Sequence, residues 1–322
     1  MFSVLLIGCG KIAGAMDAAS GSSVQSHAAA IGQHPGFRIE ACVDTNPLAA
    51  RNFAEKFEIE DVYPSVDTID EKKKFDLAVI CSPDDTHFQV AHSLLTPGSP
   101  QVLAIFIEKP VCSTPEELKS LLELGNNRNI PIFVNMSRRF HHLYRHLKQT
   151  GFRAETGPLF RADIFYYGGW RHNGIHVVDT LSYIFDGGLV GLEVIDQAKD
   201  HKNDPTLSLR GRLSEEDAEI WIHGLTNIPY QVFDFDLKYS RGRLQIRNFE
   251  SDVSWERAET NNRGESVLVP GSLLTGLPGI TTFETAYSEL HGFLQTGIPG
   301  NLSGVTLAAI APVMNVLWSV TR

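Results

Sequence analysis

A glycine-rich motif stands directly after the first apolar run of the chain. Residues 8–13 read Gly-Cys-Gly-Lys-Ile-Ala, which matches the G-x-G-x-x-G/A pattern found where a strand turns into a helix. Glycines at these positions permit a tight turn and let backbone N–H groups approach a pyrophosphate at the positive end of the helix. The motif therefore predicts a dinucleotide cofactor in contact with Gly8, Gly10, Lys11 and Ile12.

An acidic residue closes the second apolar run. Asp44 follows the strand expected at Arg38–Val43, where a carboxylate accepts hydrogen bonds from an adenosine ribose. Because a carboxylate there repels the 2′-phosphate of NADP, we predict NAD as the cofactor, with NADP less favoured. Asp44 lies 34 residues after Gly10, beyond the usual ~20. The excess falls in the small and polar residues Ala15–Ser26, which we interpret as an inserted loop beside the cofactor, either a passive surface loop or a lid that contacts substrate.

A lysine ends a third candidate strand. Glu108-Lys109-Pro110 follows the strand expected at Val102–Ile107, at the carboxyl edge where open α/β sheets bind ligands. A lysine partly desolvated there has a lowered pKa and can hydrogen-bond a substrate hydroxyl while hydride leaves the adjoining carbon. The alternative is a strand-end lysine that is merely solvated.

Further along the chain, polar side chains recur at helical spacing. His172, His176, Asp179 and Tyr183 stand at i, i+4, i+7 and i+11 of a helix expected over about 172–185, so they share one face. Two histidines one turn apart can hold zinc, but the sequence offers neither the H-E-x-x-H glutamate nor an obvious third ligand. We predict no metal site.

Five motifs occur in the order seen in the glucose-fructose oxidoreductase/inositol dehydrogenase (Gfo/Idh/MocA) family, which the chain resembles over its whole length. They are the glycine motif, Ser82-Pro83-Asp84-Asp85-Thr86-His87, Glu108-Lys109-Pro110, Arg138-Arg139-Phe140 and Gly174-x-His176-x-x-Asp179. The resemblance implies that Lys109 and His176 flank the sugar carbon that is oxidised. It also implies that the loop carrying Ser82, Pro83 and His87 packs against the cofactor.

One position departs from this family. Many members have Asp four residues before the helix histidine, where this chain has His172. The segment His172–His176 resembles a branch of the family that also carries a long insertion after the glycine turn and is associated with surface-polysaccharide sugar metabolism. We expect His176 to move the proton, Lys109 to orient the oxygen and His172 to orient or relay. The remaining assignments place Glu108 with Lys109 at the cofactor, and the substrate at Arg138, Trp170, Arg171 and Asp179.

The order of apolar runs indicates two domains, as the length of 322 residues also suggests. Residues 1–135 alternate short apolar runs with helix signals, which is typical of an α/β Rossmann domain. Its strands are expected at Val4–Ile7, Arg38–Val43, Leu77–Cys81, Val102–Ile107 and Ile132–Val134. Residues 136–322 are expected to form an α+β domain with a large, mostly antiparallel open sheet. Its strands are expected at Leu159–Tyr167, Leu207–Leu213, Ala218–His223, Gln231–Tyr239, Arg243–Arg247 and Ser266–Val269, and helices at 172–185 and 301–320.

Composition narrows the class of protein. The net charge of −10 has the wrong sign for holding a nucleic-acid backbone, so we expect no nucleic-acid partner. The apolar stretch Leu307–Trp318 is too short to cross a bilayer, and the first residues read as a strand rather than a signal peptide. The four cysteines form no C-x-x-C pair, which favours buried thiols in the cytoplasm. An open sheet with an apolar face would favour a homodimer or homotetramer.

Taken together, these features predict an NAD-dependent enzyme that transfers hydride at a secondary alcohol of a sugar, a sugar derivative or a nucleotide-linked sugar. Two alternatives stay open. One is a non-catalytic, nucleotide-binding sensor or regulatory protein that keeps the fold, because fold alone does not establish activity. The other is a redox-neutral NAD-dependent sugar enzyme that oxidises its substrate only transiently.

Overall fold

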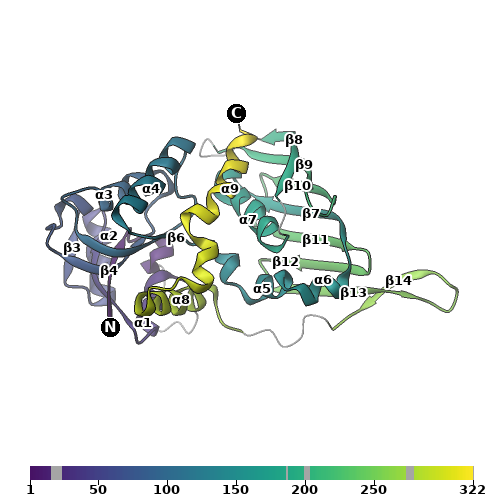
Figure 1. Ribbon diagram of the computed structural model, residues 1–322, viewed down its shortest axis with the longest axis horizontal. Coiled ribbons are helices and arrows are strands. Elements are labelled where there is room, and N and C mark those ends of the chain that lie inside the picture. The colour runs from purple at the N-terminus through teal and green to yellow at the C-terminus, as the bar shows by residue number, and fades with distance from the viewer. Residues whose placement is uncertain (16–23, 186–187, 199–203, 273–278, 322) are drawn as a thin grey trace. The chain divides into compact units, whose positions relative to one another are not determined.

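The computed structural model describes residues 1–15, 24–185, 188–198, 204–272 and 279–321 (Figure 1). The chain divides into two compact units, of which the first comprises Met1–Phe140 and Ile280–Pro312 and the second His141–Gly279 and Val313–Arg322. These units differ from the expected domains, 1–135 and 136–322, chiefly because the chain returns to the first unit at Ile280. Most of the inserted loop expected at Ala15–Ser26 lies outside the described residues.

The first unit is built on a six-stranded parallel sheet in the order β3-β2-β1-β4-β5-β6. Its strands are β1 (Phe2–Ile7), β2 (Phe37–Val43), β3 (Asp61–Tyr63), β4 (Lys74–Ile80), β5 (Gln101–Ile107) and β6 (Ile132–Val134). The central strands are almost fully buried, as expected of a parallel sheet covered on both faces. The Rossmann prediction is confirmed. Only β3 was missed, because it has three residues and none of them is fully buried.

Helices of the first unit begin where the sequence signals them. They are α1 (His27–Gln33), α2 (Pro47–Phe57), α3 (His87–Leu94) and α4 (Pro115–Arg128), with short turns η1 (Lys11–Ala15), η2 (Val66–Thr68), η3 (Asp84–Thr86) and η4 (Ser137–Phe140). A capping box forms at the start of α4, since the Thr114 hydroxyl accepts from the Glu117 N–H and the Glu117 carboxylate accepts from the Thr114 N–H. Asn46, two residues after Asp44, caps α2 because its side-chain oxygen accepts the N–H groups of Leu48 and Ala49.

The C-terminal part of the chain contributes a helix that the sequence analysis missed. α8 (Thr282–Thr296) starts at a second capping box, Thr281 with Glu284, and places the buried Tyr287 edge-on to Phe37 and Phe106. The helix expected over 301–320 is divided into η6 (Gly300–Val305) and α9 (Leu307–Ser319). Among the described helices, none combines the length and the apolar character needed to cross a membrane.

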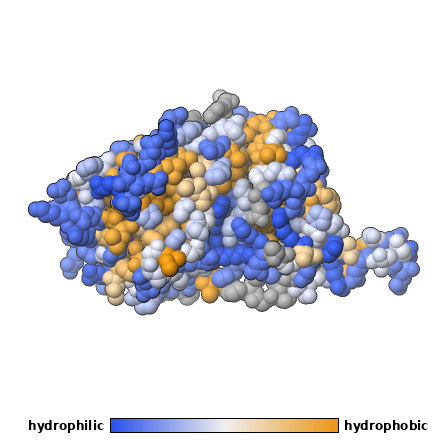
Figure 2. Space-filling view, in the orientation of Figure 1, coloured by the Kyte–Doolittle hydropathy of each residue, from blue (hydrophilic) through white to orange (hydrophobic). Residues whose placement is uncertain are grey.

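The second unit contains an eight-stranded sheet in the order β14-β13-β12-β11-β7-β10-β9-β8, in which β7 and β10 run parallel and the other pairs antiparallel. Its elements are α5 (His142–Lys148), α6 (Thr150–Thr156), β7 (Leu159–Tyr167), η5 (Trp170–Gly174), α7 (Ile175–Ile184), β8 (Leu189–Ala198), β9 (Thr206–Leu213), β10 (Glu219–Leu225), β11 (Phe233–Tyr239), β12 (Gly242–Arg247), β13 (Asp252–Thr260) and β14 (Ser266–Pro270). The predicted fold class is confirmed. β8 and β13 were missed because they are mostly exposed and lack a regular apolar alternation. The β13–β14 hairpin projects from the sheet and its far end is mostly hydrophilic (Figures 1 and 2).

One face of this sheet corrects an expectation. Strands β7, β10, β11 and β12 bury alternate residues, but the opposite face is charged rather than apolar. Asp163 bonds Arg161 at 2.8 Å and Lys238 at 2.7 Å, and Asp236 bonds Lys238 at 3.0 Å and Arg243 at 2.7 Å. The hydrogen bond from Arg161 has the largest effect on Asp163, and that from Lys238 adds to it. Together they hold the pKa of the Asp163 carboxyl well below its usual range. The face is a network of ion pairs.

Candidate functional site

The glycine turn after β1 is packed on one side and open on the other. Gly8 has φ 95°, donates its N–H to the Val43 carbonyl at 2.8 Å, and leaves no room for a side chain, since a Cβ would lie 2.5 Å from the Ser82 nitrogen. A Cβ on Gly10, in contrast, would meet nothing within 4 Å. Lys11 and Ile12 are exposed at the start of the following turn. The turn thus offers a backbone surface that a pyrophosphate can approach closely.

Asp44 is fixed beside this turn by two backbone donors. Its Oδ2 accepts the Cys9 N–H at 2.8 Å, and its Oδ1 accepts the Asn46 N–H at 2.8 Å. A carboxylate has about four acceptor positions, so two remain for ribose hydroxyls. The same bonds tie the glycine turn to the start of α2.

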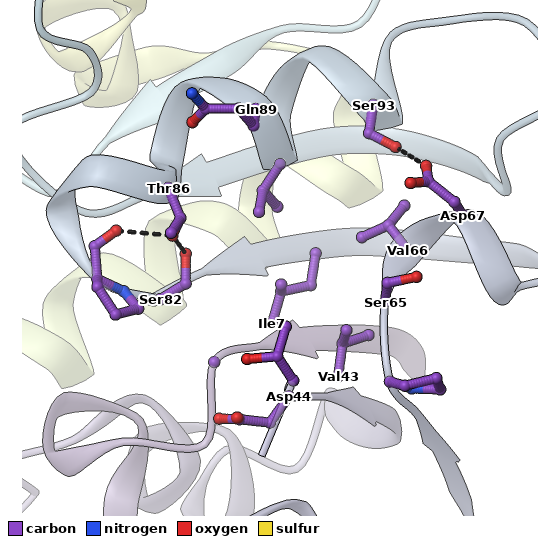
Figure 3. Close-up of a pocket in the computed structure, with 15 residues that line it drawn as sticks. Ile7, Val43, Asp44, Ser65, Val66, Asp67, Ser82, Thr86, Gln89 and Ser93 are labelled. Carbon is purple, nitrogen blue, oxygen red and sulfur yellow. Dashed lines mark hydrogen bonds between the residues drawn. The ribbon is translucent and has the colours of Figure 1, made fainter. Parts of the chain in front are cut away.

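A pocket of about 250 Å³ opens where the strand order reverses, between the ends of β1, β2 and β4 (Figure 3). Its walls are largely apolar, from Val43, Val66 and Val90, and Asp44 lies on its rim. In Figure 3, Ser82 with its partner Thr86 lies on the side opposite the Ser93–Asp67 pair. Open α/β sheets bind nucleotides at this reversal point, and an apolar slot beside a ribose-binding carboxylate fits an adenine. The residues present therefore fit NAD.

His87 connects the two loops at this edge. It is fully buried, with Nδ1 2.7 Å from the Pro110 carbonyl oxygen and Nε2 2.7 Å from the Ser82 carbonyl oxygen. The cofactor contact expected of His87 does not fit this enclosure, because both ring nitrogens already face protein carbonyls. His87 instead holds the loop that carries Ser82 and Pro83 against the Glu108-Lys109-Pro110 loop.

Glu108 bonds two protein side chains through one of its carboxylate oxygens. Its Oε1 is 3.0 Å from His27 Nε2 and 2.6 Å from Asn135 Nδ2, and its side chain is 12% exposed. Burial raises the pKa of this carboxyl, but the bonds from His27 and Asn135 and the charge of Lys109 outweigh burial and lower it. Glu108 is therefore a carboxylate held by protein donors, and the half-buried Lys109 next to it follows the end of β5 at the same sheet edge as Asp44.

His27 and Asn135 were missed because their partner is distant in sequence. One signal for His27 was available in the sequence. His27 begins α1 and is followed by three alanines, whose small side chains are typical of a helix that packs closely against its neighbours.

In the second unit, the turn before α7 carries most of the remaining candidates. Trp170 is fully buried and its indole N–H donates to the Leu317 carbonyl at 3.2 Å, so the substrate contact expected of Trp170 does not fit. Gly174 packs on the Trp170 ring where a Cβ would clash. Asp204 accepts the backbone N–H groups of Arg171 at 2.9 Å and His172 at 2.8 Å, and so fixes the turn.

The polar stripe expected on one helix face is only partly continuous. α7 begins at Ile175, so His172 belongs to the preceding π-type turn, whereas His176 and Asp179 lie on α7 itself. His172 is exposed, His176 is half-buried with its ring edge-on to Phe233 at 6.1 Å, and Asp179 is 1% exposed. Within the described ranges, no three His, Cys, Asp or Glu side chains are grouped to hold a metal. Arg138, 7% exposed, belongs to the first unit, and Arg171 to the second.

Comparison with known proteins identifies the first unit. Residues 2–136 match the family described as "Oxidoreductase family, NAD-binding Rossmann fold" (GFO_IDH_MocA). The inositol 2-dehydrogenase of Rhizobium meliloti (strain 1021) is 30% identical over 114 residues, which cover 35% of this chain and 33% of that protein. The match thus spans about a third of the length of that relative.

Solved structures resemble the whole chain. An oxidoreductase from Agrobacterium radiobacter, in complex with NAD+, L-tartaric acid and magnesium, has a TM-score of 0.71 at 15% identity and covers 99% of this chain and 95% of its own. The WlbA dehydrogenase of Bordetella pertussis, in complex with NADH and UDP-GlcNAcA, has a TM-score of 0.75 at 16% identity, covering 100% and 95%. Residues 2–136 thus match the NAD-binding Rossmann domain of the Gfo/Idh/MocA oxidoreductase family, and the whole chain shares the fold of these solved structures.

The position of Asp44 leads to a prediction about cofactor choice. We expect NADH to bind at least tenfold more tightly than NADPH, a difference of ~1.4 kcal/mol, because the carboxylate repels a 2′-phosphate. Fluorescence titration of both cofactors measures this ratio. Asp44→Asn should reduce it, whereas Asp70→Asn, at an exposed aspartate outside the pocket, should leave it unchanged. Equal affinities in the unaltered protein would refute the role of Asp44.

Proposed function

We propose that the protein is an NAD-dependent oxidoreductase that transfers hydride at a secondary alcohol of a sugar, a sugar derivative or a nucleotide-linked sugar. The observation that carries this proposal is Lys109, which follows a buried carboxylate at the sheet edge where the NAD-binding residues Gly8 and Asp44 also lie. A polyhydroxylated substrate is supported by the relatives, one named as an inositol dehydrogenase and one solved with a UDP-sugar.

The roles of the side chains follow from their chemistry. NAD, when bound, accepts or returns the hydride. Lys109 donates a hydrogen bond to the substrate oxygen, which favours the oxygen's developing charge. His176 takes the hydroxyl proton in the oxidation and returns it in the reduction. His172 orients the substrate or relays a proton, and Arg138, Arg171 and Asp179 complete the substrate contacts.

This proposal is tested by removing the two side chains that act on the oxygen. Lys109→Met and His176→Ala should each lower kcat by roughly 10²–10⁴, the usual contribution of general acid–base catalysis, while NADH affinity stays nearly unchanged. Lys119→Met, at an exposed lysine on α4, is the matched control and should retain full activity. NADH formation with a panel of sugars and UDP-sugars gives the rates.

Other outcomes separate the alternatives. Binding of NADH and sugar without turnover in the unaltered protein would contradict the proposal and support a sensor, and turnover without net NADH would support a redox-neutral enzyme. His172→Asp restores the commoner residue of the family and should keep appreciable activity. If His172→Ala is as damaging as His176→Ala, His172 takes part directly in proton transfer.

We further propose that the protein forms a homodimer or homotetramer in the cytoplasm. Support for the location is that all four cysteines are buried free thiols. Support for assembly comes from the outer face of the eight-stranded sheet, where Phe165 stacks on His223 at 4.7 Å and His223 on Trp221 at 6.4 Å, among charges of both signs. Aromatic residues and balanced charge suit a self-complementary two-fold contact.

Light scattering tests the assembly. We expect a mass of two or four times 35.6 kDa at micromolar concentration. Phe165→Glu should shift the mass toward the monomer because it places a charge among the stacked rings. Leu48→Glu, at an exposed leucine on α2, should not. A monomer in the unaltered protein would overturn the proposal.

A further inference from the structure

A chain of buried polar groups lies behind Lys109, and the proposed reaction does not yet use it. Tyr287 Oη is 2.8 Å from His27 Nδ1, His27 Nε2 is 3.0 Å from Glu108 Oε1, and Asn135 Nδ2 is 2.6 Å from the same oxygen. His27 and Tyr287 are fully buried, and Asn135 is 6% exposed. The chain joins α8, α1, the end of β5 and the end of β6.

One arrangement of hydrogens gives every group in this chain a partner. The Asn135 amide nitrogen only donates, so Glu108 is the acceptor, and an ionised carboxylate accepts from His27 Nε2–H as well. His27 Nδ1 is then the acceptor for the Tyr287 hydroxyl. With these hydrogens, His27 holds Glu108 as a carboxylate and is itself held by Tyr287.

The surroundings make Glu108 depend on these bonds. The rings of Phe283 and Phe106 pack edge-on against His27 at 5.0 and 5.7 Å, so protein groups rather than water must stabilise the charge. Two other titratable groups lie near Glu108, namely Cys81 and Tyr287. Burial raises the pKa of both, so both stay neutral through the physiological range. His27 and Asn135 by hydrogen bonds, and Lys109 by its charge, therefore keep Glu108 ionised.

We propose that His27 is a positioning residue for the reaction. Through its bond to Glu108 it anchors the loop that carries Lys109, so that Lys109 is held in place to donate a hydrogen bond to the substrate oxygen. This inference rests on the proposed function. Tyr287 supports it by fixing the orientation of the His27 ring.

The direction of the effect follows from the charge. Without the Nε2–H donor the carboxylate of Glu108 is less stable, so the pKa of Glu108 rises. As the pH falls, Glu108 then takes up a proton at a higher pH, which weakens the bonds it accepts from His27 and Asn135 and so releases the Lys109 loop earlier. The acid limb of kcat/KM should therefore move to higher pH.

Two measurements test this on the full chain. The first follows the Glu108 side-chain carboxyl carbon by NMR across pH, with ¹³C-labelled glutamate and the signal assigned by Glu108→Gln. In His27→Ala we expect its midpoint to rise by about one pH unit or more, as for a lost hydrogen bond to a charged group. The second records kcat/KM against pH with NAD+ and a sugar that the unaltered protein oxidises, and we expect the acid limb to move in the same direction.

Three further variants sharpen the comparison. His27→Gln, whose amide can still donate, should recover part of both shifts. His92→Ala, at a half-buried histidine on α3, should move neither. If His27→Ala does not fold, Tyr287→Phe takes its place, since it removes only the hydroxyl, and a smaller upward shift is expected.

The outcomes are distinct. An unmoved Glu108 midpoint in His27→Ala, or in Tyr287→Phe where that variant replaces it, overturns the inference, and so does an equal shift in His92→Ala. A moved midpoint with an unmoved acid limb overturns the positioning role. Absence of turnover in the unaltered protein overturns the proposed function and the positioning role with it, while the Glu108 titration still decides whether His27 sets this charge.

Discussion

A carboxylate removed from water must be hydrogen-bonded by the protein, and at Glu108 this requirement constrains four segments of the chain. A charge removed from water costs several kcal/mol unless donors replace the lost hydration. His27 has to reach Glu108 from the start of α1 and Asn135 from the end of β6, while Tyr287 on α8 holds His27 in place. α1 must therefore begin with His27 at this position, and the C-terminal return must bring α8 beside α1. Lys109 is placed as a consequence, because it is the next residue.

The rest of the sheet edge is tied together by similar bonds between loops. Asp44 holds the Cys9 N–H of the glycine turn, and His87 bridges the carbonyls of Ser82 and Pro110. Each bond links the end of one strand to the end of a neighbouring one, so Lys109 and the pocket beside Asp44 share one set of supports. A substitution of His87 would therefore disturb both the loop that carries Ser82 and the loop that carries Lys109.

Much of the fold could be predicted because the first 135 residues alternate buried strands with capped helices. The elements that were missed, β3, β8 and β13, are short or exposed, so burial leaves no pattern in their sequence. For the site, local motifs predicted that Gly8, Asp44 and Lys109 lie at the same edge of the sheet. They could not predict His27 or Tyr287, whose contacts join residues 81 and 260 positions apart. Nor could they separate a buried support from a ligand contact, as the enclosed side chains of His87 and Trp170 show.

The most direct test of this account is a crystal structure of the protein with NAD+. The account predicts adenine in the pocket between Val43 and Val66, ribose hydroxyls on Asp44, and the nicotinamide beside Lys109, with Glu108 still bonded to His27. A cofactor bound away from Asp44, or a Glu108 turned away from His27 to contact the nicotinamide, would contradict it.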